Sequence, residues 1–371
     1  MKNKIRFVTL YPRCHNPGLM KDVGQIPDTL GRNYDEIDAT LASSIVNMAD
    51  ENIKLLTGMK IEKLPFVLKN DFLTGVKYIL KNGKKVDWFN FYHGGRKVYY
   101  WTKLYKVLNP NGKVYLKLDL SYEGCRKYSE SKKENRIFNK TVKAVDIVSV
   151  ESEAIRNLTK QFCDSDIMLI CNGYVDHARF EIKKLQDREK SFITVGRLGT
   201  AQKATELLLG AFAKTAASHD WELKLVGPVE DEFKIEIERF FNDNPNLKKR
   251  VKFIGPIYNK SKLYDLYNSS RVFVLPSRWE GFPLVGPEAL HCGCRMILTD
   301  IIPPIKELTN DGRYGIKIRT NDENAIAEGL MEEINRNTND IEPLEIADYA
   351  KRELSWDGIC EKLYQKMKET N

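Results

Sequence analysis

Residues 271–293 read Arg271-Val-Phe-Val-Leu-Pro-Ser-Arg-Trp-Glu280-Gly-Phe-Pro-Leu-Val-Gly-Pro-Glu288-Ala-Leu-His-Cys-Gly293. The apolar run at the start predicts a buried strand, and Pro287 suits the first turn of a helix. Gly281 allows a tight loop between them, with backbone amides that can face a ligand. Glu280 in the loop and Glu288 in the first helical turn can then face one cleft, where the positive end of the helix favours a phosphate. The alternative, that the glutamates cap the helix, explains either one better than the pair.

A second stretch has the same strand, turn and helix order. It reads Thr194-Val-Gly-Arg-Leu-Gly-Thr-Ala-Gln-Lys203 and continues into an apolar helix that reaches Phe212. Arg197 and Lys203 lie in or just after the turn, where helix amides and fixed positive charge together suit an oligophosphate. A solvated lysine is an equally open interpretation of this stretch taken alone.

The whole chain of 371 residues alternates short β-branched or aromatic runs with helical stretches. This pattern predicts an α/β fold with two doubly wound, Rossmann-like parallel sheets, divided after residue 174 into domains 1–174 and 175–355. Ligands in such sheets bind beyond the carboxyl ends of the strands. The expected strands are residues 5–11, 53–57, 86–92, 113–118, 145–150 and 167–170, then 192–195, 222–226, 251–254, 272–275, 296–298 and 315–318.

The spacing of the two glutamates within Pro-Ser-x-x-Glu-Gly-Phe-Pro-Leu-x-x-x-Glu-Ala-Leu, preceded by Val-Gly-Arg-Leu and a lysine, resembles the retaining nucleotide-sugar glycosyltransferases of family 4. The resemblance is specific over residues 191–310 and looser over the rest of the chain. It implies the GT-B fold of two facing Rossmann-like domains. In that fold the C-terminal domain holds the donor, the N-terminal domain holds the acceptor, and a last helix, here within residues 356–371, crosses back to the first domain.

The resemblance also implies roles for individual residues. Arg197 and Lys203 would bind the donor diphosphate, Glu288 the ribose hydroxyls, and Glu280 the transferred sugar. Preformed cations stabilise the charge that develops on a departing diphosphate, so we expect neither a metal ion nor another cofactor. The one Asp-x-Asp, at residues 164–166, precedes a strand, where a metal site in the cleft is not expected. Backbone contacts to the donor would come from Gly255, Ile257, Gly281, Phe282, Pro283 and Leu284.

The N-terminal domain matches the family less closely. Lys21 and Gly24 follow the first strand, where the family usually has a glycine-rich loop facing the donor, and the alternative is a surface turn. Many family members end the strand at 113–118 with a histidine facing the acceptor, and this chain has Asp119 there instead, two residues after Lys117. Asp119 could orient or deprotonate an acceptor hydroxyl, unless this sheet end is purely structural. His93, at another strand end, is the second candidate, although a lone histidine is more often structural.

Charge divides unevenly along the chain. Residues 1–174 hold 29 Lys and Arg against 19 Asp and Glu, whereas residues 175–371 hold 30 against 32. The basic half indicates an anionic partner, or a solvated lysine-rich surface. Two basic stretches, residues 96–106 with interleaved aromatics and residues 126–143, suit an acidic lipid interface. No apolar run is long enough to cross a bilayer and the seven cysteines have no regular spacing, so we expect a cytoplasmic protein at the inner face of the membrane.

The sequence therefore favours a retaining glycosyltransferase that moves a sugar, with a UDP-sugar as the favoured donor, to a glycan or lipid-linked acceptor in surface polysaccharide or glycolipid synthesis. A nucleotide-sugar epimerase or a sugar phosphorylase of the same fold is the enzymatic alternative. A non-catalytic scaffold subunit is the other, but it would not need Arg197, Lys203 and both glutamates. Nucleic-acid binding ranks last because the basic half has no recognisable reader motif.

Overall fold

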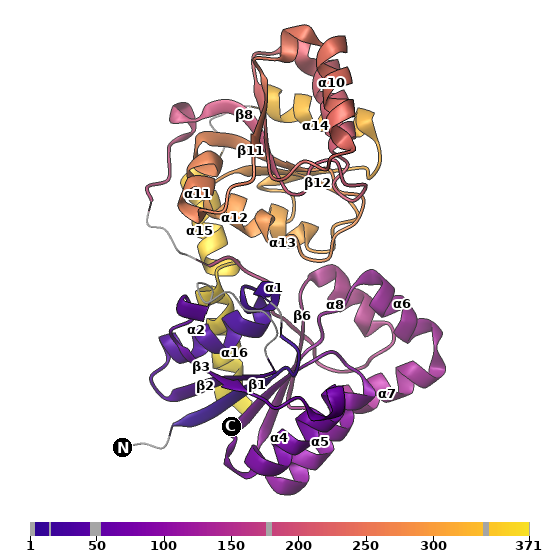
Figure 1. Cartoon of the computed structure of the whole chain (residues 1–371), viewed down its shortest axis with the longest axis vertical. Helices are drawn as coiled ribbons and strands as arrows, with labels where there is room; N and C mark the ends of the chain where they lie inside the picture. The colour runs from indigo at the N-terminus through magenta and orange to yellow at the C-terminus, as the bar shows by residue number, and fades with distance from the viewer. Residues whose placement is uncertain (1–3, 15, 45–52, 176–179, 337–340, 371) are drawn as a thin grey trace. The chain divides into compact units, whose positions relative to one another are not determined.

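The structure is a computed structural model that describes residues 4–14, 16–44, 53–175, 180–336 and 341–370. These residues form two compact units (Figure 1). One unit runs to Gly173 and also includes the chain from Trp356 onward, and the other is Tyr174–Ser355.

The first unit is built on a seven-stranded parallel sheet of order β3-β2-β1-β4-β5-β6-β7. From β1 the chain adds β2 and β3 on one side, and it then adds β4 to β7 on the other side. The boundary between β1 and β4 is therefore the switch point of a doubly wound fold. The strands are β1 Ile5–Leu10, β2 Ile37–Ser43, β3 Met59–Lys63, β4 Trp88–Tyr92, β5 Lys113–Lys117, β6 Ile147–Val150 and β7 Met168–Leu169. The helices are α1 Asn16–Leu19, α2 Asp22–Asn33, α4 Asp71–Asn82, α5 Arg96–Leu108, α6 Tyr122–Glu130, α7 Lys132–Val142, α8 Glu153–Lys160 and α16 Trp356–Thr370.

The second unit repeats this architecture with a six-stranded parallel sheet of order β10-β9-β8-β11-β12-β13. Its switch point lies between β8 and β11. The strands are β8 Glu189–Val195, β9 Glu222–Val226, β10 Val251–Gly255, β11 Ser270–Leu275, β12 Arg295–Thr299 and β13 Gly315–Ile318. The helices are α9 Thr205–Thr215, α10 Phe233–Asp243, α11 Lys260–Ser269, α12 Val285–His291, α13 Ile305–Thr309, α14 Glu323–Asn335 and α15 Pro343–Glu353.

Local sequence sets where several helices begin. The side chains of Asn70, Asn259 and Asp322 each accept a hydrogen bond from a backbone amide in the first turn of α4, α11 and α14. Such caps satisfy donors that a helix start leaves free. Apolar faces then cover the sheets: the ring of Tyr105 from α5 packs edge-on at 4.7 Å from that of Phe89 on β4.

The last helix belongs to the first unit. Helix α16 packs against α2, where Arg32 pairs with Asp357 at 2.9 Å and the rings of Tyr34 and Tyr364 stack at 3.6 Å (Figure 1).

The predicted α/β fold of two doubly wound parallel sheets is confirmed, with one error in the first sheet. The strand expected at residues 53–57 does not form; Leu56 instead closes a turn by donating to the Ile53 carbonyl. The strands beside β1 on this side of the sheet are instead β2 and, at the edge, β3. Because β2 lies between two neighbours, its small residues Ala39 and Ala42 are buried, and a strand with so few large apolar side chains gives a weak sequence signal.

None of the described helices is long and apolar enough to cross a membrane.

Candidate functional site

The loop after β8 lies at the switch point of the second sheet. Its entry is tightly packed: a Cβ on Gly227, at the end of β9, would lie 1.8 Å from the carbonyl oxygen of Gly196, so only glycine fits there. The loop closes where the Gly199 amide donates to the Thr205 hydroxyl at 3.0 Å, and α9 starts at Thr205. Lys203 extends its side chain back over Gly196. The loop therefore carries a cation to the carboxyl end of β8.

The loop after β11, the other strand of the switch point, meets this cation. The Lys203 ammonium lies 2.5 Å from Glu280 Oε1, and the Ser277 hydroxyl donates to the same oxygen at 2.8 Å. The side chains of Lys203 and Glu280 are 17% and 8% exposed, so the pair lies in a largely desolvated place. The structure thus brings together two of the residues that the sequence predicted for the site.

Backbone contacts fasten the two loops to each other. Arg278 donates its amide to the Gln202 carbonyl at 2.8 Å, and the Gln202 side chain donates to the Trp279 carbonyl at 3.0 Å. The Arg278 guanidinium reaches the Ala201 carbonyl at 2.8 Å and pairs with Glu206 at 2.5 Å. Sequence reasoning missed Arg278 and Gln202, because residues more than 70 positions apart meet only through the strand order.

Glu288 lies in the first turn of α12 and is nearly buried. One carboxylate oxygen pairs with Lys260 at the start of α11, and the other, Oε2, is buried without a hydrogen-bond partner among the described residues. The Tyr267 hydroxyl is also buried without such a partner, and the charge of Glu288 contributes to raising the pKa of Tyr267, after burial. Lys260 was not predicted as a residue of the site. Its position directly after Asn259, which caps α11, was the sequence signal that could have indicated it.

The other predicted residues of this unit lie in the loops after β8 and β11, and at or just beyond the end of β10. Arg197 is exposed, and no ion pair of its side chain is recorded among the described residues. Gly281 is exposed, Pro283 is buried, and Phe282 and Leu284 are half-buried. Gly255 ends β10 with φ +84°, its carbonyl accepts the Gly227 amide at 3.0 Å, and Ile257 is half-buried just beyond.

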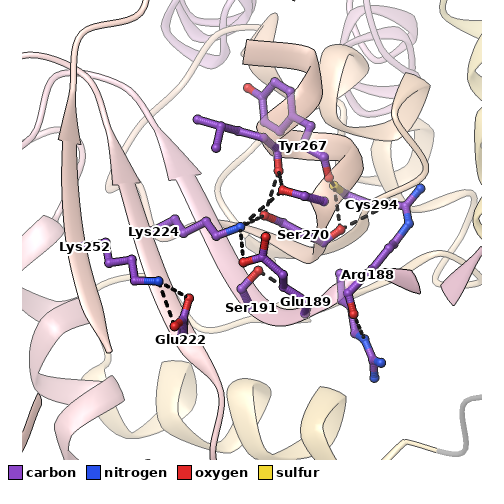
Figure 2. Close-up of polar contacts among 12 residues, drawn as sticks. Arg188, Glu189, Ser191, Glu222, Lys224, Lys252, Tyr267, Ser270 and Cys294 are labelled. Atoms are coloured by element: carbon purple, nitrogen blue, oxygen red, sulfur yellow. Dashed lines mark hydrogen bonds and ion pairs between the residues drawn. The ribbon is translucent and has the colours of Figure 1, made fainter. Parts of the chain in front are cut away.

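A set of polar contacts lies at the other end of β8 and β11, where Glu189 and Ser270 begin these strands. Figure 2 shows Lys224 on β9 pointing toward Glu189 and Ser270; it lies 2.9 Å from the Glu189 carboxylate. Arg188 donates to the Cys292 carbonyl at 2.7 Å, at the end of α12, and Cys294 donates to the Tyr267 carbonyl at 3.1 Å. These contacts fix α12, and hence Glu288. All seven cysteines are free and buried.

In the first unit, Lys21 is exposed at the start of α2, and Gly24 is buried in its first turn. The Gly24 amide already donates to the Lys21 carbonyl at 3.2 Å, and a Cβ there would lie 2.2 Å from the Leu19 carbonyl oxygen. Close packing against α1 therefore accounts for this glycine, and its role in donor binding stays a prediction.

Asp119 and His93 both lie at strand ends of the first sheet in left-handed backbone conformation, with φ +45° and +64°. Both side chains are exposed. Glu151 holds the backbone at Asp119: its carboxylate accepts the amides of Asp119 at 3.0 Å and Leu120 at 3.2 Å. A non-glycine residue in this conformation is costly and is often found at functional sites.

The recorded ion pairs of Lys117 are with Glu151 and Asp22, and none with Asp119 is recorded among the described residues. Lys117 is fully buried, 3.1 Å from Glu151 and 3.9 Å from Asp22, and it donates to the Ile170 carbonyl at 2.8 Å. Burial raises the pKa of Asp22 to about 7, with Lys117 acting in the opposite direction. Burial likewise raises the pKa of Glu151; Lys117 acts in the opposite direction, and the charge of Asp119 raises this pKa further.

No group of three or more His, Cys, Asp or Glu side chains among the described residues could hold a metal ion. Asp164 and Asp166 lie just before β7, the place that the sequence indicated.

Two Rossmann-like units, with a cation and a carboxylate meeting at the switch point of the second, define a protein of the GT-B fold. The model of the family described as "Glycosyl transferases group 1" matches residues 189–335. An uncharacterised glycosyltransferase of Haemophilus influenzae is 26% identical over 288 residues, which are 76% of this chain and 76% of that protein.

Two more proteins are similar. N-acetylgalactosamine-N,N'-diacetylbacillosaminyl-diphospho-undecaprenol 4-alpha-N-acetylgalactosaminyltransferase of Campylobacter jejuni is 30% identical over 155 residues, 40% of this chain and 39% of that protein. The crystal structure of Anabaena Alr3699/HepE in complex with UDP has a TM-score of 0.68 at 15% identity and covers 99% of this chain and 100% of its own. Together these findings support a glycosyltransferase with the GT-B fold.

Proposed function

We propose that this protein is a retaining glycosyltransferase of family 4. It would move a sugar from a nucleotide-sugar donor to a glycan or lipid-linked acceptor in surface polysaccharide or glycolipid synthesis. A UDP-sugar is the favoured donor, supported by the family resemblance and by the UDP in the similar Anabaena structure. A lipid-linked acceptor is supported by the diphospho-undecaprenol in the name of the Campylobacter relative.

The contact between Lys203 and Glu280 carries this proposal. A sugar diphosphate has a hydroxylated ring on one side of the bond that breaks and a dianionic group on the other. Glu280 suits the ring hydroxyls, and Lys203, with Arg197 beside it, suits the diphosphate. A carboxylate and an ammonium 2.5 Å apart match the two sides of that bond.

In the proposed reaction, the bond from the anomeric carbon to the diphosphate oxygen breaks, and a bond from that carbon to the acceptor oxygen forms. The electron pair leaves with the diphosphate, where Lys203 and Arg197 stabilise the developing charge, so the proposal needs no metal ion or other cofactor. The acceptor proton passes to Asp119, with His93 as the alternative base. Glu288 and the backbone from Gly281 to Leu284 would hold the nucleotide and the sugar.

The donor is tested first. A panel of nucleotide sugars should include at least one that raises the melting temperature, because a ligand that binds the folded state stabilises it. Incubation with that donor alone separates a transferase from an epimerase, which would convert the sugar without an acceptor. If no nucleotide sugar changes the melting temperature, the proposed function is wrong.

The stereochemistry is tested by NMR of the product. The linkage should keep the anomeric configuration of the donor, because no second carboxylate is proposed on the opposite face of the sugar. An inverted linkage would contradict the family assignment.

A further inference from the structure

A pocket of about 260 Å³ opens at the switch point of the first sheet. Leu10 ends β1 and Tyr92 ends β4, and both line the pocket. In doubly wound sheets this is the place where ligands bind. The pocket therefore has the position of a binding site independently of the second unit.

Two cations of the pocket share one carboxylate. Arg13 Nε lies 2.7 Å from Asp71 Oδ1, and Lys97 Nζ lies 3.8 Å from Asp71 Oδ2. These three side chains together carry one net positive charge, while the charges of Asp119 and Asp22 act on the hydroxyl of Tyr11 in the same pocket. Among the described residues no hydrogen bond or ion pair is recorded for the two terminal nitrogens of Arg13, whose side chain is 54% exposed and whose guanidinium lies over the ring of Phe66 at 5.3 Å. A planar pair of donors beside a second cation is the arrangement that binds a carboxylate or a phosphate.

The side chain of Lys97 is partly buried in the wall of the pocket. Its pKa is lowered by burial; Asp71 acts in the opposite direction, and Arg13 adds a smaller lowering. Burial thus disfavours the charged form of Lys97, and an added anion would favour it.

Aromatic side chains form the other walls of the pocket. The rings of Tyr11 and Tyr92 meet edge-on at 5.4 Å, and Lys97 lies over the ring of Trp101 at 5.2 Å. The Tyr92 hydroxyl is buried and has no hydrogen-bond partner among the described residues. Flat aromatic rings beside these polar groups suit a ring with hydroxyl substituents, in addition to the anion.

We propose that this pocket binds an anionic group, a phosphate or a carboxylate, carried by the sugar acceptor. That the ligand is the sugar acceptor rests on the proposed function, whereas the anion site itself does not. An uncharged acceptor would cover Arg13 and Lys97 and displace their water without offering their net charge a partner.

Calorimetric titration with glucose 6-phosphate and glucuronate, with glucose as the uncharged probe, tests the anion site. The anionic sugars should bind more tightly than glucose. Arg13→Gln and Lys97→Gln should each weaken binding about 10-fold, the scale of one charge-assisted hydrogen bond. Arg96→Gln is the matched control, because Arg96 is an exposed cation that precedes Lys97 on α5 and does not line the pocket.

Asp71→Asn should change the affinity for anionic sugars in the opposite direction. Removing the carboxylate that competes for both cations should tighten binding of the anionic sugars several-fold, which a merely structural role would not do. If binding is absent, or ignores Arg13, Lys97 and Asp71 alike, the anion site is overturned.

A lipid headgroup and a water-soluble sugar can present the same anion, and a second measurement separates them. Vesicles of phosphatidylcholine with and without phosphatidic acid are compared for retention of the protein and of Arg13→Gln and Arg96→Gln. A larger loss for Arg13→Gln supports the site with a lipid phosphate as its ligand. If Arg13→Gln and Arg96→Gln lose vesicle binding equally and the calorimetric titrations still depend on Arg13, the site stands and its ligand is a soluble anion. If the losses are equal and the titrations do not depend on Arg13, the site is overturned.

Failure of the proposed function would be visible separately. If no nucleotide sugar shifts the melting temperature but the anion titrations depend on Arg13 and Lys97, the transferase proposal fails and the anion site stands. If donors bind and the titrations fail, the reverse holds.

Discussion

The contact of Lys203 with Glu280 shows what single residues reveal only in the folded chain. The sequence indicated both residues from their own loops, but not that they touch, because 77 positions separate them. Their meeting depends on β8 and β11 being neighbours in the sheet, a long-range pairing that local periodicity does not specify.

Lys203→Ala should lower turnover about 100-fold, because it removes one preorganised charge facing the leaving diphosphate. Initial rates with the donor found in the panel measure it. Lys214→Ala is the control: Lys214 lies on the next helix and pairs with Glu323 at 2.7 Å, away from the switch point. Wild-type turnover of Lys203→Ala would remove Lys203 from the mechanism, and equal losses in both variants would indicate a folding defect.

Glu288→Gln and Glu280→Gln should separate binding from transfer. Glu288 has a buried oxygen without a partner and is assigned to the ribose, so its amide should chiefly weaken nucleotide affinity. Glu280→Gln should chiefly lower turnover, because this carboxylate pairs with Lys203 and is assigned to the reacting sugar. Calorimetry with the nucleotide alone and initial rates provide the two readouts. Equal loss of nucleotide affinity in both variants would contradict the division of roles.

At the level of strands and helices, buried charges shape the acceptor side. Lys117 on β5 joins Asp22 of α2 to Glu151 beyond β6, and Glu151 in turn fixes the backbone of Asp119. The exposed Asp119 is thus positioned by groups that are themselves hidden from solvent. The sequence placed Asp119 at a strand end but gave no signal for Glu151, which is 32 positions away.

Asp119→Asn should lower transfer to the acceptor while leaving nucleotide-sugar affinity unchanged, because asparagine tolerates the left-handed backbone and lacks the base. Asp119→Gly is a second variant without backbone strain at φ +45°. Loss of transfer in both stable variants supports the base. If both variants transfer the sugar normally, His93 is the better candidate for the base. In that case His93→Ala should transfer the sugar more slowly than the wild type.

Asp22 should make stability depend on pH. Its pKa is raised to about 7 in the folded protein, mainly by burial, so between about pH 4 and 7 the folded state holds a proton that the unfolded chain has lost. The contribution of Asp22 to stability therefore falls as pH rises through this window. Asp22→Asn should remove that fall, and the variant should gain stability relative to wild type from pH 5 to pH 7.5 in urea unfolding. A difference that is constant with pH would contradict the raised pKa.

The two sheets differ in how far sequence could predict them. Strands β9 and β13 were predicted at their observed bounds, since a run such as Glu222–Val226 is short, alternates charged with apolar residues at its start and is followed by Gly227 and Pro228. Strand β2 was missed because Ile37–Ser43 has small and polar residues that become buried only between two neighbouring strands. Propensity describes a strand's own residues, whereas burial in a central position depends on the rest of the sheet.

For the molecule as a whole, the excess of positive charge in the first half has a structural counterpart. Residues 66–108 hold nine Lys and Arg against two Asp. Helices α4 and α5 lie side by side there (Figure 1) and expose large apolar side chains together with cations. We call this the α4–α5 face; its exposed apolar residues are Phe72, Leu73, Leu80, Tyr100 and Val107, and its exposed cations include Lys77, Lys81 and Lys103.

The second basic stretch, residues 126–143, differs from this face. It lies on α6 and α7 and exposes cations such as Arg126, Lys132 and Arg136. Among its described residues no large hydrophobic side chain is strongly exposed. Cations attract an acidic bilayer, but apolar side chains are needed to insert into its interface. The α4–α5 face is therefore the stronger candidate for the proposed contact with a membrane.

Vesicle flotation tests this contact with two charge-matched variants. Replacing Lys77, Lys81 and Lys103 by glutamine should weaken binding to acidic vesicles by about 100-fold, at about 1 kcal/mol for each cation near the surface. Replacing Arg126, Lys132 and Arg136 by glutamine removes the same charge and should weaken it less. Adding Leu73→Ser and Val107→Ser should reduce the part of the binding that survives high salt, because screening acts on charges and not on apolar insertion. Equal losses in both charge variants would leave only diffuse attraction by the basic unit, and binding that ignores lipid charge and salt would exclude an electrostatic contact altogether.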